Sequence, residues 1–288
     1  MKEAWHRWGE ADEVGALNAI GPAEVVAAAR LVSEGRVLSL AQPVSPGMMI
    51  PEHRPGMMHF MGRDGGDYAA GGRRPGGFQF SEDTIVMPMH GGTHLDALCH
   101  CWYDDALYNG FSATEVRSDG ARRCGVDKMP PIVTRGVLID FVALTGAPLA
   151  DGHVIGADLL GQAISAAGVS PRKGDAVLLR TGWQERQVPG QADFNAEPGL
   201  DVEAALQLAQ AEVALIGADN FAVEVLPFPE GQVFPVHQRL IRDYGIPLLE
   251  GLMLEELGRV KPGPFLFLTA PLSIVGGTAS PVNPVAVL

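Results

Sequence analysis

Apolar runs typical of strands and of helices follow one another along most of the chain. "GPAEVVAAARLVSEG" predicts a helix with Pro22 in its first turn and Gly35 at its C-terminal end. Further strands are predicted at "RVLSLA", "DTIVMPMH", "GVLIDFVAL", "DAVLLRTGW", "VALIGAD", "IPLLEGL" and "PFLFLTAPL", and helices at "ADLLGQAISAAGVS", "GLDVEAALQLAQAE" and "QRLIRDYG". Because strand and helix alternate from about residue 135, the pattern favours an α/β layered fold with at least some parallel strands.

Residues 44–82 interrupt this pattern, because they are rich in Gly, Pro and Met. Such punctuation predicts no long regular elements. The segment is expected to be either a surface loop or a lid or arm that contacts substrate, since long loops in compact domains are often functional. Its basic residues, Arg63, Arg73 and Arg74, are then either solvated or face an anionic substrate. No shift of composition divides the chain, so residues 1–288 are predicted to form one domain with an arm at about 44–82.

The composition narrows the classes of function. Hydrophobic residues make up 47% and charged residues 19%, as in soluble globular proteins, and the formal net charge is −13. An acidic chain without a Lys/Arg cluster is not expected to bind nucleic acid. The chain starts without the apolar segment of a signal peptide and has no apolar run of about eighteen residues, so no membrane span is expected. Three cysteines without a CxxC spacing favour a reducing compartment, and we expect the cytoplasm.

The stretch "HGGTHLDALCH", from His90 to His100, gathers three of the eight histidines and one aspartate. Two adjacent glycines disfavour a helix and predict a tight turn that folds His94 back towards His90. His94 and Asp96 are two residues apart, so in extended chain they point to the same side. Two imidazoles and a carboxylate suit Zn²⁺ or Mn²⁺ with positions left open for water. The alternative is a turn that carries histidines without a metal.

His100 has two possible roles in this cluster. It is either a further ligand or, as a neutral imidazole, the proton acceptor for a water whose pKa a divalent ion lowers to about 7. The flanking Cys99 and Cys101 are predicted to be core residues, because strand alternation points them away from His100.

Other motifs give little support to other enzyme classes. The chain has no GxSxG sequence, and "RDGGDYAAGGRRPGG" matches neither GxGxxG nor GxxxxGK[ST]. Trp183 and Phe221 are candidates for the walls of an aromatic substrate pocket, with core packing as the alternative.

The pattern HxGTHxDxxxH resembles the signature of the cyclase-like metal hydrolases, a family that includes bacterial kynurenine formamidase, isatin hydrolase and polyketide-type cyclases. "RWGEADEVGALNAI", "YDDALYNGF", "RTGW" and "GADNFAVEVLP" resemble segments of its longer members, so the resemblance spans most of the chain. It implies a swivelling β/β/α fold, with mixed sheet layers and flanking helices, and a homodimer or homotetramer.

The resemblance also implies roles for six residues. One or two ions, Zn²⁺ or Mn²⁺, would be held by His90, His94 and Asp96 and by a second set containing His237 and Glu250, with His100 as the catalytic acid/base. Glu250 is a candidate ligand even without the resemblance, because it lies inside the apolar run "IPLLEGL". Burying a carboxylate there is costly unless a cation or partner satisfies it. The alternatives are a solvent-facing strand end for Glu250 and a surface helix position for His237.

The resemblance implies a metal-dependent hydrolase that cleaves the C–N bond of a small amide, either an aryl formamide or a cyclic amide. The alternatives are a polyketide-type cyclase or dehydratase, a lactone hydrolase, and a metal- or ligand-binding protein without catalysis. Leu98 stands where the formamidase motif usually has proline, and the arm before His90 is longer than in the short formamidases. Both departures leave the substrate unspecified.

Overall fold

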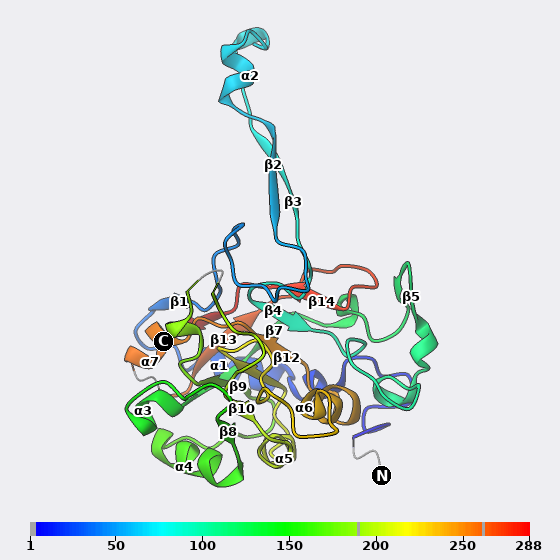
Figure 1. Cartoon of the computed structure of the whole chain (residues 1–288), viewed down its shortest axis with the longest axis vertical. Coiled ribbons are helices and arrows are strands. Elements are labelled where there is room, and N and C mark those ends of the chain that lie inside the picture. The colour runs from blue at the N-terminus through cyan, green and yellow to red at the C-terminus, as the bar shows by residue number, and fades with distance from the viewer. Residues whose placement is uncertain (1–3, 189–190, 261–262) are drawn as a thin grey trace.

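The structure, a computed structural model, describes residues 4–188, 191–260 and 263–288. Its centre is a nine-stranded mixed sheet (Figure 1). From one edge to the other its strands are β1 (Val37–Ser39), β15 (Val285–Val287), β13 (Phe265–Thr269), β7 (Ile132–Asp140), β9 (Ala176–Arg180), β11 (Leu215–Ala218), β12 (Leu248–Glu250), β4 (His94–Asp96) and β14 (Ala279–Pro281).

The middle of the sheet is parallel and its flanks are antiparallel. Strands β7, β9, β11 and β12 pair in parallel, whereas β13, β15, β1, β4 and β14 join by antiparallel pairing. Every residue of β9 and β11 is buried, as expected for parallel strands covered on both faces. The prediction of an α/β fold with mixed layers and parallel strands is therefore confirmed.

Helices flank this sheet. They are α1 (Pro22–Ala29), α3 (Phe141–Thr145), α4 (Ala157–Ala167), α5 (Val202–Gln210), α6 (Pro235–His237) and α7 (Glu255–Val260), and a π-helical turn, Gln238–Asp243, continues α6. Short 3₁₀ turns lie at Gly15–Ala19, Pro75–Gly77, Tyr108–Gly110, Ala113–Glu115, Val126–Lys128 and Gln184–Arg186. Helix α1 packs on β7 and β13, and α4 packs on β7 and α5. Two small ladders, β8 (Val154–Ile155) with β10 (Gly199–Leu200) and β5 (Val116–Arg117) with β6 (Gly120–Ala121), complete the body.

The predicted strand "GVLIDFVAL" is correct only in its first half. The strand β7 ends at Asp140, and α3 begins at the next residue. The Asp140 carboxylate accepts a hydrogen bond from Ala143 N at 2.8 Å, which satisfies a free N–H group of the first helical turn. The local cap therefore outweighs the strand propensity of the apolar residues that follow.

The segment before His90 forms an arm that projects from the body (Figure 1). It consists of β2 (Met58–Arg63), α2 (Gly65–Ala69) at the tip and β3 (Glu82–Val86), with β2 and β3 paired antiparallel. The prediction of little regular structure in residues 44–82 is wrong for this part. The strand predicted to end at His90 stops at Val86 and belongs to the arm, because Pro88 has no N–H group to continue a ladder.

The burial of the cysteines bears on the prediction that Cys99 and Cys101 are core residues. Cys99 and Cys124 are buried, Cys101 is partly buried, and all three are free thiols.

Within the described ranges, none of the helices combines the length and the apolar character needed to cross a bilayer.

Candidate metal centre

Pairing between β4 and β12 places two polar side chains against each other inside the sheet. Glu250 lies directly opposite His94 in the antiparallel register, and directly opposite residues project to the same face. Their side chains meet with His94 Nε2 at 3.3 Å from Glu250 Oε2. Asp96, two residues along β4, projects to the same side, and its Oδ1 lies 3.6 Å from His94 Nε2. The prediction that strand alternation aligns His94 and Asp96 is confirmed.

A tight turn before β4 brings His90 to the same place. Gly92 has a φ of 60°, a left-handed conformation that glycine adopts without strain. The Thr93 hydroxyl donates to Gly251 O at 2.7 Å and ties the turn to the end of β12. The rings of His90 and His94 are consequently 5.3 Å apart, so the predicted fold-back of the two imidazoles is confirmed.

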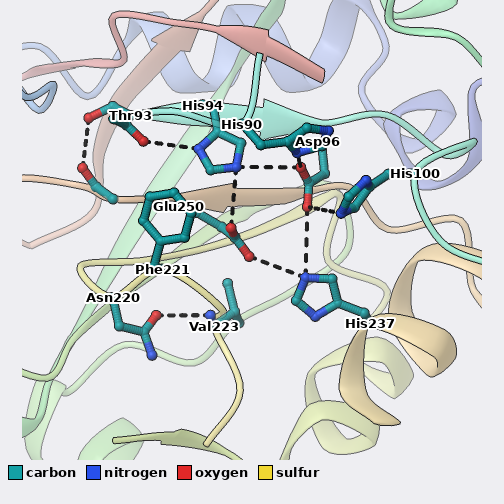
Figure 2. A network of polar contacts seen from close by, with 12 residues as sticks. His90, Thr93, His94, Asp96, His100, Asn220, Phe221, Val223, His237 and Glu250 are labelled. Atoms are coloured by element: carbon teal, nitrogen blue, oxygen red, sulfur yellow. Dashed lines mark hydrogen bonds and ion pairs between the residues drawn. The ribbon is translucent and has the colours of Figure 1, made fainter. Parts of the chain in front are cut away.

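His237, at the end of α6, closes the cluster from the opposite side (Figure 2). Its Nε2 lies 3.3 Å from Glu250 Oε1 and 3.8 Å from Asp96 Oδ2. Both His237 and Glu250 are buried, so a surface helix position for the first and a solvent-facing strand end for the second are excluded. Three segments of the chain, residues 90–96, the end of α6 and the end of β12, thus converge on one point.

Each of the three imidazoles at the centre has its outer nitrogen fixed by another group. The contacts are His94 Nδ1 to Gly92 O at 2.9 Å, His237 Nδ1 to Glu224 Oε1 at 2.5 Å, and His90 Nε2 to Thr278 Oγ1 at 3.1 Å. Metal-binding histidines are held in this way, because the outer bond fixes the tautomer and the orientation of the ring.

The inner atoms of the same cluster have no such partner. His90 Nδ1, His94 Nε2, both Asp96 oxygens and Glu250 Oε1 are buried, and none has a hydrogen-bond partner among the described residues. His90 Nδ1 lies 2.8 Å from Asp96 Oδ1 without the orientation of a hydrogen bond. Buried polar atoms are nearly always paired, and a divalent cation satisfies nitrogen and carboxylate donors together. The donor set therefore fits a metal ion such as Zn²⁺ or Mn²⁺.

The ionisation of the cluster follows from this crowding. Burial disfavours a charge on His237, but the adjacent Glu224 and Glu250 raise its pKa well above the ordinary value. Burial likewise opposes a charge on His94, but the neighbouring carboxylates of Glu250 and Asp96 raise the pKa of His94. Without a cation, protons on these two imidazoles therefore offset part of the negative charge of the buried carboxylates.

His100 differs from the other histidines of the cluster. Its side chain is 27% exposed, against 0% for His94, and it lines the pocket that leads to the cluster. Burial lowers the pKa of His100 to about 4, so the imidazole is neutral at pH 7 and can accept a proton. Its Nε2 lies 3.9 Å from Asp96 Oδ2.

A cavity of about 810 Å³ opens over His100, His237 and Glu250. Its walls include Phe194 and Phe221, the second of which was one of the two aromatic candidates in the sequence. The rings of Phe194 and Phe221 meet edge to face at 5.3 Å. Trp183 is fully buried behind Phe194, with the two rings 5.6 Å apart, and is not among the residues that line the cavity. Of the two predicted aromatic residues, the structure therefore places one in the wall and the other in the core.

Three residues near the site were not identified from the sequence. Glu224 holds His237, Arg54 lines the cavity and donates to His90 O, and Glu197 lies in the cavity wall. Glu224 could have been found from the sequence, because it lies inside the apolar run "AVEVLP". Burying a carboxylate there is costly, as it is for Glu250. Arg54 and Glu197 lie in irregular segments, and no local pattern of the sequence indicates that they lie beside the cavity.

Fold and site together define an α/β protein with a buried histidine–carboxylate cluster, fitted to a divalent ion, at the floor of an aromatic pocket. A family model described as "Putative cyclase" matches residues 38–225. The chain therefore belongs to the cyclase family. The candidate residues His237 and Glu250 lie beyond the matched part.

Several proteins are similar to this chain. A crystal structure described as a novel cyclase is 33% identical, covers all of both chains and superposes with a TM-score of 0.92. The kynurenine formamidase of Sphingopyxis alaskensis is 28% identical over 69% of this chain and 77% of that protein. That of Salinibacter ruber is 42% identical over 27% of this chain, a match that spans 34% of that protein. Isatin hydrolase A from Labrenzia aggregata shares the fold, with a TM-score of 0.66 at 22% identity over 87% of this chain and 93% of that chain.

Proposed function

We propose that the protein is a metal-dependent hydrolase that cleaves the C–N bond of a small amide, either an aryl formamide or a cyclic amide. The observation that carries the proposal is the set of partnerless inner atoms of His90, His94, Asp96 and Glu250 beneath an open aromatic pocket. The likeness to kynurenine formamidases and to an isatin hydrolase supports the choice of an amide.

Two sets of residues would hold the ion or ions. The first is His90, His94 and Asp96, whose donor atoms lie within 4.8 Å of one another. The second would use the other oxygen of Asp96 with His237 and Glu250, which the structure brings within 3.8 Å and 3.3 Å of His237 Nε2. When bound, Zn²⁺ or Mn²⁺ supplies Lewis-acid polarisation of the carbonyl and lowers the pKa of water.

His100 would move the proton in the reaction. Its neutral Nε2 accepts a proton from the water that attacks the amide carbonyl carbon, and then returns it to the leaving nitrogen. The low pKa of His100 keeps its imidazole unprotonated at neutral pH, so that it can accept a proton. The nearby aromatic rings Phe194 and Phe221 would orient an aryl group and exclude water.

One observation favours a different role for His100. Its donor atom lies within 4.8 Å of those of Asp96 and His237, so these three also form a potential metal-binding group. If His100 binds the metal, it takes the coordination position that water would need, as expected of a metal-binding protein without catalysis. The two roles predict different results for His100→Ala. If His100 carries the proton, the variant keeps the metal and loses turnover. If His100 is a ligand, the variant loses the metal.

The experiment that tests the function is a hydrolysis screen of purified protein with added Zn²⁺ or Mn²⁺. The substrates are formyl-aryl amides, isatin-like cyclic amides and aryl lactones, and Asp96→Ala serves as the inactive variant. We expect turnover of at least one amide, lost in Asp96→Ala together with bound metal, while His153→Ala, an exposed histidine outside the cluster, keeps both. Turnover of lactones without amides, or activity in metal-free protein, would refute the proposal.

We also propose that the protein is a homo-oligomer assembled through the arm. Met58, Phe60 and Val86 lie on one face of the arm, because Met58 pairs with Val86 and Phe60 is two residues further along β2. All three are about half exposed, and an isolated two-stranded ribbon is marginally stable in water. A second copy of the chain would cover this apolar face by symmetric contact, the commonest arrangement among oligomers.

A further inference from the structure

An arginine at the base of the arm brings a positive charge to the cavity. Arg54 precedes β2, and of the described residues that line the cavity it is the one with a permanent positive charge. A guanidinium group stays protonated at every pH that proteins ordinarily meet. Arg54 takes no part in the proposed metal set or proton transfer, so its charge needs a separate explanation.

Two contacts fix the position of this guanidinium group. Arg54 Nη1 donates a hydrogen bond to His90 O, and the guanidinium carbon lies over the Phe221 ring, 5.3 Å from its centroid. The Phe221 ring in turn contacts the imidazole of His94, with the two centroids 5.2 Å apart. The charge of Arg54 is therefore held beside the aromatic wall of the cavity and next to the histidine cluster.

One edge of the guanidinium group remains unused. Nη1 of Arg54 makes the hydrogen bond to His90 O, whereas Nε and Nη2 make none with any residue in the described part of the chain. Unlike the inner atoms of the metal cluster, these two nitrogens are accessible rather than enclosed, and they belong to a residue that lines the cavity. An edge with two parallel N–H groups is the part of arginine that binds both oxygens of a carboxylate.

The carboxyl groups of the cavity do not satisfy this edge. Glu250 and Asp96 attract the guanidinium group through space without a hydrogen bond to it, and both belong to the set of atoms that fits a divalent ion. Glu52 and Asp193 also line the cavity, but both are exposed to water, which screens their charge. The charge of Arg54 therefore remains available to an anionic group of a ligand.

An aromatic ligand would meet the rings of the wall and Arg54 together. A ligand ring packed against Phe194 or Phe221 lies beside the guanidinium group, because Arg54 itself contacts Phe221. We propose that Arg54 determines specificity by binding a carboxylate attached to an aromatic ligand, through its Nε–Nη2 edge. Hydrolysis of a cyclic aryl amide leaves a carboxylate on the ring, so Arg54 then holds the ring-opened product. This last step rests on the proposed function.

The test measures the binding of two probes to the Zn²⁺-loaded protein by calorimetry. Benzoate carries a carboxylate, and benzyl alcohol carries a neutral group on the same ring. We expect wild type to prefer benzoate and Arg54→Met to reduce this preference about 10–100-fold, the range expected when hydrogen bonds to a charged group are lost. Because a carboxylate also binds metal, benzoate affinity is compared at equal zinc content, and the difference between the two proteins belongs to Arg54.

The matched control is Arg74→Met. Arg74 also lies over a phenylalanine ring, 4.8 Å from the centroid of Phe80, but it is on the arm and does not line the cavity. Its loss should leave both affinities unchanged. An unchanged preference in Arg54→Met overturns the assignment. Equal weakening of benzoate and benzyl alcohol overturns it as well, because it shows that Arg54 shapes the pocket without binding the carboxylate.

Arg54→Lys covers the case in which Arg54→Met does not fold or loses its zinc. Lysine keeps the charge but has no edge with two parallel donors, so benzoate should bind several-fold more weakly while benzyl alcohol binds as before. Equal benzoate affinity in wild type and Arg54→Lys overturns the assignment.

Neither variant has to be assayed for catalysis. Benzoate binding that depends on Arg54, without hydrolysis of any amide, would overturn the proposed function alone. Amide hydrolysis together with benzoate binding that does not depend on Arg54 would overturn this inference alone.

Discussion

Glu224 and His237 form a buried pair in which the carboxylate oxygen Oε1 lies 2.5 Å from the imidazole Nδ1. Glu224 also accepts hydrogen bonds from the backbone N–H groups of Val236 and His237, both at 3.0 Å. One carboxylate thus fixes both the start of α6 and the direction of the His237 ring, whose Nε2 faces Asp96 and Glu250.

We therefore expect Glu224→Ala to lower the affinity for Zn²⁺ or Mn²⁺ by about 10–100-fold, the usual effect of losing a group that orients a metal ligand. Titration against a competing chelator measures this affinity. Glu230→Gln, an exposed carboxylate outside the cluster, is the control and keeps wild-type affinity. Unchanged affinity in Glu224→Ala would show that His237 is not a ligand.

Metal uptake is expected to release protons. The pKa values of His94 and His237 are raised by neighbouring carboxylates in the metal-free cluster, so both rings hold protons below those pKa values. Their Nε2 atoms must lose them to bind an ion, and about two protons are released if both rings take part. The affinity for metal then falls as the pH falls. Calorimetry in buffers of different ionisation enthalpy counts the protons, and a buffer-independent heat would contradict the expectation.

His100→Ala should lower kcat by about 10²–10⁴-fold, the usual contribution of a positioned acid/base, with the metal content unchanged. Steady-state kinetics and metal analysis of the same preparation measure both quantities. Loss of metal together with activity would assign His100 to the metal shell instead. His153→Ala, which removes an exposed imidazole elsewhere, controls for the loss of a histidine as such.

The pH dependence of kcat/KM should show the low pKa of His100. Burial lowers this pKa to about 4, so the neutral, proton-accepting form persists as the pH falls and is lost only as the pH approaches that value. At saturating metal we expect activity limited by His100 to stay level from about pH 7 to pH 5 and then decline. A decline centred near the ordinary histidine pKa of about 6.5 would contradict this environment.

The arm offers a matched pair of substitutions for the oligomer. Phe60 and Met61 are 53% and 50% exposed, but as successive strand residues they face opposite sides of the ribbon. Phe60→Asp should shift the protein towards a monomer in light scattering after size exclusion, because a charge cannot be buried at low cost in an apolar contact. Met61→Asp should have little effect. Equal results for the two variants would exclude the face containing Phe60 as the contact.

The sequence predicts the part of the site that is local in the chain. The turn at Gly92 and the alternation of His94 and Asp96 depend on residues within one short stretch, and the structure has both. Glu250 was identifiable as well, because the high cost of burying a carboxylate in an apolar strand is visible without knowing its neighbours.

The remaining features depend on contacts between distant segments. Trp183 and Phe221 are equally apolar in the sequence, but Phe194 covers the first and leaves the second in the cavity wall. Glu197 lies in an irregular segment, and its position beside Phe221 follows from strand-like pairing with Leu226. The strands of the arm were missed because Gly and Pro at its tip are typical of irregular loops, and the strands that flank the tip are short and exposed.

The register between β4 and β12 has a consequence for the order of events during synthesis. Thr93 and Gly251, which tie the two strands together, are 158 residues apart in the chain. Contacts of such separation form slowly and require most of the chain to be present. An emerging chain therefore displays His90, His94 and Asp96 long before His237 and Glu250 leave the ribosome. A metal ion captured early would meet an incomplete set of ligands, so full retention of the metal would require that the sheet has closed.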